Sequence, residues 1–177
     1  MSFDFFKVIA DIYAPKVENT IELQQPDTSR TEPQSEIQPI SNNSSYESQI
    51  FYLVNEYRTN LRLCGLRSVA QLNEIALSHS RAMQKVNTAS HDNGTERGKQ
   101  VQALGLMSFG ENVQMRQCYP HQVAETINLF VPGWIGSPGH RQTMEMSIFT
   151  YTGIGLAIGP YQKDTVIIFA TQVFAGA

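Results

Sequence analysis

Cysteine is scarce in this sequence: Cys64 and Cys118 are the two cysteines among 177 residues. Two cysteines are too few for a disulfide framework, and they lack the CxxC spacing of many metal-binding and redox motifs. We expect two free, semi-buried thiols. A disulfide between the end of one helix and a loop remains the alternative if the protein reaches an oxidising compartment.

Long apolar runs and clusters of basic residues are also missing. Hydrophobic residues make up 41% of the chain, which suffices for one sizeable core. No run, however, approaches the roughly 20 apolar residues that cross a bilayer. The formal net charge is -3, and lysine and arginine occur at most in isolated pairs. We therefore expect no transmembrane segment and no binding to nucleic acid or to an anionic membrane.

The first 44 residues differ in composition from the rest. Asp4 precedes Lys7 and no cleavage site follows an unbroken apolar stretch, so we expect no ordinary secretion signal, and the compartment stays open. Phe3 to Tyr13 has apolar residues at helical spacing, which predicts a short helix that either docks on the domain or a protein partner, or frays. Val17 to Asn43 is rich in Glu, Gln, Ser, Thr and Pro, which predicts a disordered linker.

Residues 45–177 are predicted to form one folded domain that begins with helices. Ser44 and Glu47 make a capping-box pattern at the start of the first helix, which Gly65 would end. The apolar face of this helix is expected to contain Ile50, Leu53, Val54, Tyr57 and Leu61. A second helix, from Leu72 to Val86, places His79 in an apolar stripe, so we expect a hydrogen-bonded core histidine there.

The rest of the domain combines two further helices with strands. We expect helices from Glu96 to Leu104 and from Pro120 to Phe130, with Pro132 ending the latter. A short strand is predicted near Asn112 to Met115. Thr152 to Ile158 and Thr165 to Phe174 are rich in Val, Ile, Phe and Thr, and Gly159-Pro160 separates them, as in an antiparallel hairpin. The domain is therefore predicted to be a layered α+β structure.

Three ionisable residues stand among turn residues that let a side chain project from a rigid backbone: His91 in SHDNG, Glu111 in FGEN and His140 in SPGHR. Ser137 and Pro138 fit the N-cap and the first position of a new helix, which would place His140 in its first turn. The partial positive charge of a helix N-terminus disfavours imidazolium, so a neutral His140 could act as a ligand or a base. The same reasoning makes Ser137 a cap rather than a nucleophile.

Two imidazoles and one carboxylate can supply three ligands of a zinc-like site, with water at the fourth position. No HExxH spacing brings His91, Glu111 and His140 together, so solvated loop residues are the alternative.

From about Tyr46 to Phe174 the chain resembles the CAP superfamily, also called SCP-like, in its bacterial form. The matching stretches occur in the family's order and are VNEYR, LCGL, LNEIALSHSRAM, SHDNG, FGEN, WIGSPGHR, YTGIGLA and ATQVF. The resemblance implies an α-β-α sandwich with a central cleft that presents two His and usually two Glu, and a secreted protein. His91 and His140 match the two histidines, which in several members bind zinc or another divalent ion, and Glu111 matches the first glutamate.

The sequence departs from the family pattern at Ser137, where many eukaryotic members have the second glutamate, and at Thr143, where bacterial relatives often have Asn. The expected set of four polar residues is thus reduced to three. The stretch between Glu111 and Trp134 is longer than usual, which would reshape the rim of the cleft.

We consider three functions. The leading hypothesis is a binding module whose cleft holds a divalent metal ion, zinc above all, or a small and even lipid-like ligand. Its cleft residues are predicted to be His91, Glu111, Asn112, Trp134, Ser137 and His140. The second is an ester or peptide hydrolase in which a metal-bound water or a residue activated by His140 attacks, with Glu111 as proton acceptor. The third is structural: the cleft residues hydrogen-bond one another and the surface serves protein recognition, with Phe3 to Tyr13 as a candidate contact.

Overall fold

The computed structural model describes residues 45–177. The predicted helix from Phe3 to Tyr13 and the predicted linker from Val17 to Asn43 lie outside these residues.

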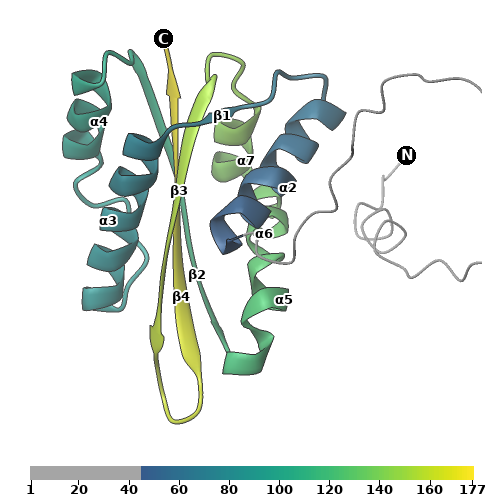
Figure 1. The fold of residues 1–177 in the computed structure, drawn as a ribbon, viewed down its shortest axis with the longest axis vertical. Coiled ribbons are helices and arrows are strands. Elements are labelled where there is room, and N and C mark those ends of the chain that lie inside the picture. The colour runs from purple at the N-terminus through teal and green to yellow at the C-terminus, as the bar shows by residue number, and fades with distance from the viewer. Residues whose placement is uncertain (1–44) are drawn as a thin grey trace, which may run out of the picture. The chain divides into compact units, whose positions relative to one another are not determined.

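A four-stranded sheet forms the middle layer of the domain, in the order β1-β3-β4-β2 (Figure 1). β3 (Tyr151–Pro160) and β4 (Val166–Gly176) form the predicted antiparallel hairpin, but Gly159 and Pro160, expected between the strands, belong to β3, and residues 161–165 make the turn. β2 (Ser108–Cys118) pairs with β4 along its whole length and is the edge strand on that side. It is much longer than the stretch predicted near Asn112 to Met115, because the register with β4 continues without interruption. β1 (Arg67–Ser68), which the sequence did not indicate, lies parallel to β3.

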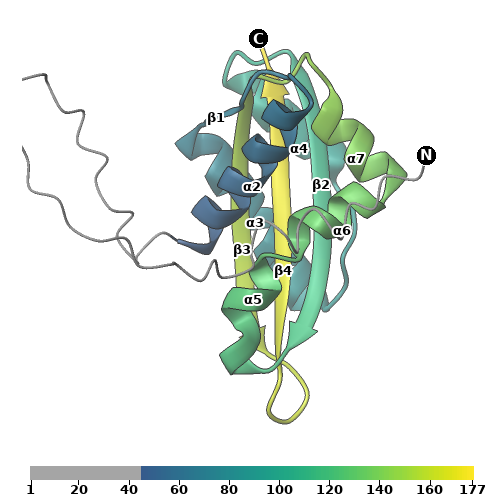
Figure 2. The same ribbon diagram turned by 90° about the vertical axis from the view of Figure 1, so that its right-hand side faces the viewer.

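Helices cover both faces of the sheet (Figures 1 and 2). α3 (Ala70–Val86) and α4 (Gly94–Ala103) lie on one face. The other face carries α2 (Tyr46–Asn60), α5 (Val123–Ile127), α6 (Phe130–Gly136) and α7 (Pro138–Glu145). The α-β-α sandwich expected from the sequence is confirmed.

The core is divided between the two faces. A large apolar cluster between the sheet and α2, α5 and α6 includes Ile50, Trp134 and Phe174, all of them fully buried. On the opposite face, Leu72 and Met83 of α3 pack against the sheet in two smaller clusters. Strand residues point alternately to the two faces, so the strands supply side chains to both halves of the core.

The N-cap of α2 is Ser45 rather than Ser44, since the Ser45 hydroxyl accepts a hydrogen bond from the backbone N–H of Ser48. The helix ends at Asn60, before Gly65, so Leu61 falls outside the apolar face and is 46% exposed. The periodicity thus predicted the helix but misplaced both of its ends by some residues, as is usual for helix boundaries.

Pro132 does not end a helix. The segment from Pro120 begins with a 3-10 turn (Pro120–Gln122) and α5, and Pro132 is then the third residue of α6. A proline fits there because the backbone N–H groups of a first helical turn have no partner within the helix.

The side chain of Arg58 links α2 to the segments around α7 and β3. Its side chain is fully buried, and its guanidinium donates hydrogen bonds to four backbone carbonyls, those of Cys64, Met144, Met146 and Phe149. These bonds connect α2 to the end of α7 and to the turn before β3. α7 carries His140, so the position of that histidine depends on this network.

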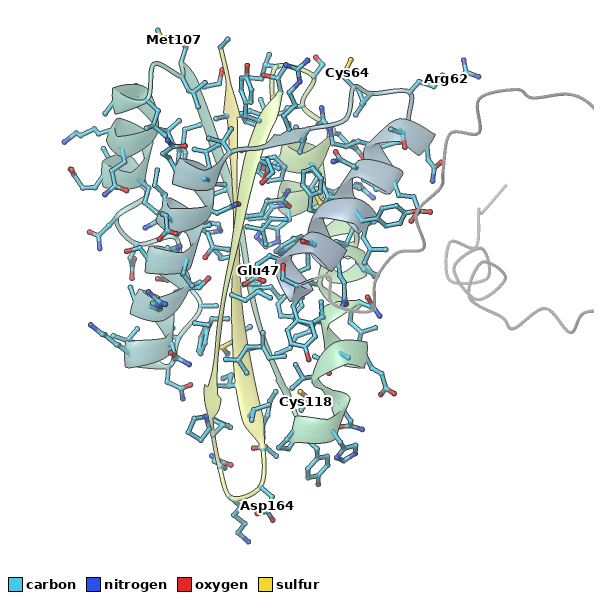
Figure 3. The ribbon with its side chains drawn as sticks, viewed as in Figure 1. Glu47, Arg62, Cys64, Met107, Cys118 and Asp164 are labelled. Carbon is cyan, nitrogen blue, oxygen red and sulfur yellow. The ribbon has the colours of Figure 1, made fainter. Side chains whose placement is uncertain are left out.

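The two cysteines are free, as expected, although Cys64 is exposed and Cys118 is buried. Figure 3 shows them near opposite ends of the domain. Among residues 45–177, no helix is both long enough and apolar enough to cross a membrane.

Candidate functional site

Two histidines from opposite faces of the sheet meet beside the edge strand β2. His91 lies in the loop between α3 and α4, and His140 lies in the first turn of α7. The centroids of their rings are 5.8 Å apart, and the ring planes are inclined by 42°. The sequence separates them by nearly fifty positions, and it is the edge of the sheet that brings them together.

Glu111 of β2 lies behind His91. Its side chain is only 4% exposed, and its carboxylate accepts hydrogen bonds from His91 Nδ1 at 2.9 Å and from two nitrogens of Arg97, Nη2 at 2.7 Å and Nε at 2.5 Å. The Nδ1 atom of His79 lies 3.3 Å from the other side of the same carboxylate. Glu111 therefore connects three basic side chains from α3, α4 and the loop between them.

The hydrogen bonds determine the charge of Glu111. Burial alone would raise its pKa, but hydrogen bonds from His79, Arg97 and His91, with the charge of Arg97, outweigh this effect and lower the pKa from 4.5 to about 2. Glu111 is therefore an anion at neutral pH. An anionic carboxylate at Nδ1 keeps the proton of His91 on that nitrogen and leaves the lone pair of Nε2 free.

His140 is favoured in its neutral form. Burial, together with the repulsion that a protonated His91 would exert, lowers its pKa below 6.5. Its backbone carbonyl accepts a hydrogen bond from the buried side chain of Asn112 at 3.1 Å, which fixes the start of α7 to β2. The predicted position of His140 in a first helical turn is confirmed.

The remaining predicted site residues are Ser137, Trp134 and Asn112. Pro138 opens α7 as expected, but the Ser137 side chain makes no capping hydrogen bond. Trp134 was expected in the wall of the cleft, yet its ring is fully buried in the core and cannot touch a ligand that enters from solvent. Asn112 is likewise fully buried and supports His140 from behind.

Two neighbours of Glu111 were not recognised as part of the site. His79 is the buried, hydrogen-bonded histidine that its apolar stripe predicted, with Thr171 Oγ1 at 3.3 Å, but it also reaches Glu111. Arg97 is 7% exposed, and it also donates to the backbone carbonyl of Asp92 at 2.6 Å. Nothing local in the sequence distinguishes this arginine from one on a helix surface.

Over residues 45–177, no three His, Cys, Asp or Glu side chains are grouped as a set of metal ligands. The carboxylate of Glu111, expected as a third ligand, instead bonds to Arg97 and to the two histidines, His79 and His91. What remains for an ion or ligand is the pair of imidazoles, His91 with its side chain 53% exposed and His140 partly buried.

Comparison with known proteins places these features in a family. Residues 51–174 match the sequence model described as CAP, the cysteine-rich secretory protein family. No curated protein matches the chain.

Among solved structures, an extracellular SCP-domain protein from Bacillus anthracis is 31% identical, with a TM-score of 0.52 over 75% of this chain and 40% of its own length. An outer surface protein from Borrelia burgdorferi is 17% identical, with a TM-score of 0.53 over 74% of this chain and 92% of its own. The CAP domain of enterococcal PrgA is 18% identical, with a TM-score of 0.50 over 74% of this chain and 60% of its own. The last two share the fold alone, and this chain spans less than half of the Bacillus protein.

Proposed function

Since the chain belongs to the CAP family of cysteine-rich secretory proteins, we propose that its domain is a binding module that holds a divalent metal ion, zinc above all, between His91 and His140.

The proposal rests on one observation: two imidazoles lie side by side at the surface, and a buried carboxylate hydrogen-bonds the inner nitrogen of one of them. Histidine ligands of metals usually donate their second ring N–H to a carboxylate, which fixes the tautomer and makes the outer nitrogen more basic. Glu111 would do this for His91. The low pKa of His140 favours the neutral form that a metal requires.

The residues present fit a metal held by two protein ligands. Zinc accepts imidazole nitrogen in four-coordinate sites, and water or a small ligand would fill the remaining positions. The bound ion would supply a positive charge that attracts an anionic or polar ligand. A lipid-like ligand gains no support here, because Trp134, the aromatic residue expected in the wall, is buried.

The geometry favours binding over hydrolysis. Glu111 was the expected proton acceptor, but a carboxylate with a pKa of about 2 is a weak base, and its oxygens already accept hydrogen bonds. Ser90, the serine next to His91, hydrogen-bonds Asp92 rather than a histidine. None of these side chains is therefore an activated nucleophile, and hydrolysis would depend on a water bound to the metal.

Calorimetric titration of the full chain with zinc tests the proposal. We expect saturable heat for the wild type and its loss in the double variant His91→Ala/His140→Ala. His121→Ala is the matched control, because His121 is exposed, stacks on Tyr119 and lies outside the pair. Equal heats for the wild type and the double variant would refute metal binding at this site.

A further inference from the structure

A hollow lies at the other end of β2, by the turn between β3 and β4. It has a volume of about 580 Å³ and is lined by Gln117, Tyr119, Gln162, Lys163, Asp164 and Thr165. Gln117 is six residues beyond Glu111 on the same strand, or about 20 Å at ~3.4 Å per residue. In Figure 3, the labelled Asp164 and Cys118 mark this end of the domain. The hollow is therefore separate from the histidine pair.

Hydrogen bonds hold the turn that lines the hollow. The Gln117 side chain donates to Thr165 Oγ1 at 3.1 Å, and Thr165 Oγ1 donates to the carbonyl of Gln162 at 2.7 Å. The backbone N–H of Tyr161 donates to the carbonyl of Thr165 at 2.9 Å. The turn is thus closed on itself and attached to β2. A preformed surface loses less conformational entropy when a ligand binds.

The aromatic side chain of Tyr119 also lines the hollow. Tyr119 is 52% exposed, and its backbone N–H donates a hydrogen bond to Gln122 Oε1 at 3.3 Å. The ring of His121 stacks against it, with 5.8 Å between centroids and 11° between planes. A half-exposed tyrosine that stacks on a neighbouring ring offers apolar surface to a ligand at little cost in side-chain entropy.

Polar side chains without partners line the same hollow as this ring. Within the described part of the chain, the side chains of Gln162, Lys163 and Asp164 make no hydrogen bond or salt bridge, so both donors and acceptors are available. The single positive charge of Lys163 is balanced by the neighbouring Asp164, which argues against a site for a multiply charged anion. The shortage of apolar side chains argues against a lipid.

We propose that this hollow binds one pyranose unit of a carbohydrate chain. A pyranose has an apolar face of C–H groups that packs on an aromatic ring, and its hydroxyl groups require donors and acceptors together, as amide and carboxylate side chains provide. The volume is within the range of about 300–1,000 Å³ typical of small-molecule sites. This function is independent of the metal at His91 and His140.

Titration of the full chain with triacetylchitotriose and with maltotriose, followed by NMR, tests the proposal. We expect at least one of them to shift signals from the turn at residues 161–165. Tyr119→Ala should weaken this binding about tenfold or more, whereas Tyr119→Phe, which keeps the ring, should retain most of it.

Two controls complete the experiment. Tyr52→Ala removes a tyrosine that is 63% exposed on α2 and should leave the affinity unchanged. His91→Ala/His140→Ala should also bind the sugar normally, so failure of the metal proposal would not affect this one. The carbohydrate site is disproved if neither sugar binds, if Tyr119→Ala binds as well as the wild type, or if only the histidine double variant loses binding.

Discussion

At the scale of single residues, Glu111 carries the most interactions in the candidate site. Its carboxylate is buried and is bonded by Arg97, His91 and His79. A buried carboxylate is stable only when such partners compensate for the loss of water. Glu111 thus supports the orientation of His91 and, at the same time, contributes to the stability of the fold.

The charge of Glu111 makes that contribution depend on pH. Because its pKa is lowered from 4.5 to about 2, the stabilisation is fully present above pH 4.5 and is lost as pH falls toward 2. At about 1.4 kcal/mol per pKa unit, this amounts to something on the order of 3 kcal/mol. We therefore expect Glu111→Gln to lower the free energy of unfolding by this order at pH 7, with a difference from wild type that shrinks between pH 4.5 and pH 2.

Urea denaturation at several pH values between 2 and 7 measures this difference. Glu96→Gln is the matched control, since Glu96 and its partner Lys99 are each 64% exposed. An exposed pair of this kind contributes about 0–1 kcal/mol, so the control should stay close to wild type. A difference between Glu111→Gln and wild type that is constant with pH would contradict the assigned ionisation.

At the scale of elements, the contact between α3 and β3 depends on two glycines. A Cβ atom at Gly153 would collide with the backbone of Leu72 and Asn73, and one at Gly155 with the backbone of Ala76 and Leu77. The backbones of helix and strand therefore pack directly against each other. This close packing also places His79 of α3 over the sheet, next to Glu111.

We expect Gly155→Ala to destabilise the domain, because the helix backbone must move away from the strand. Overpacked cores lose about 1–3 kcal/mol, and a clash with backbone lies at or above the upper end of this range. Gly136→Ala is the control, because a Cβ there has nothing within 4 Å. Thermal unfolding checks this prediction, and equal midpoints for the two variants would contradict it.

At the scale of the whole molecule, the two thiols differ in exposure and lie far apart. Cys64 is exposed near one end of the domain and Cys118 is buried near the other (Figure 3). A disulfide requires Cα atoms within about 7 Å of each other, so the two cannot form one within the folded domain.

Thiol titration with a chromogenic disulfide reagent tests this arrangement. We expect one thiol to react in the native protein and two after denaturation, since burial protects Cys118 until the domain unfolds. Cys64→Ser should remove the native reaction and retain one thiol after denaturation. A native protein with no reactive thiol and a mass two hydrogens lower would instead indicate an internal disulfide.

The sequence determined the features that depend on neighbours within a few positions. Helical periodicity predicted α2 and α3, helix-end signals predicted α4, and a composition rich in Val, Ile, Phe and Thr predicted the hairpin of β3 and β4. Pro138 marked the start of α7 and thereby placed His140 in its first turn. Short polar motifs also singled out His91, Glu111 and His140, because turn residues beside ionisable ones are a local signal.

Only the tertiary structure decided which of these residues meet. His91 and His140 approach each other because the helices on the two faces of the sheet both reach the edge strand β2. The Arg97 guanidinium forms an ion pair with the Glu111 carboxylate, and the Trp134 ring is buried in the core rather than exposed to a ligand. Contacts of this kind depend on strand order and on the packing of distant segments, which local sequence patterns do not encode.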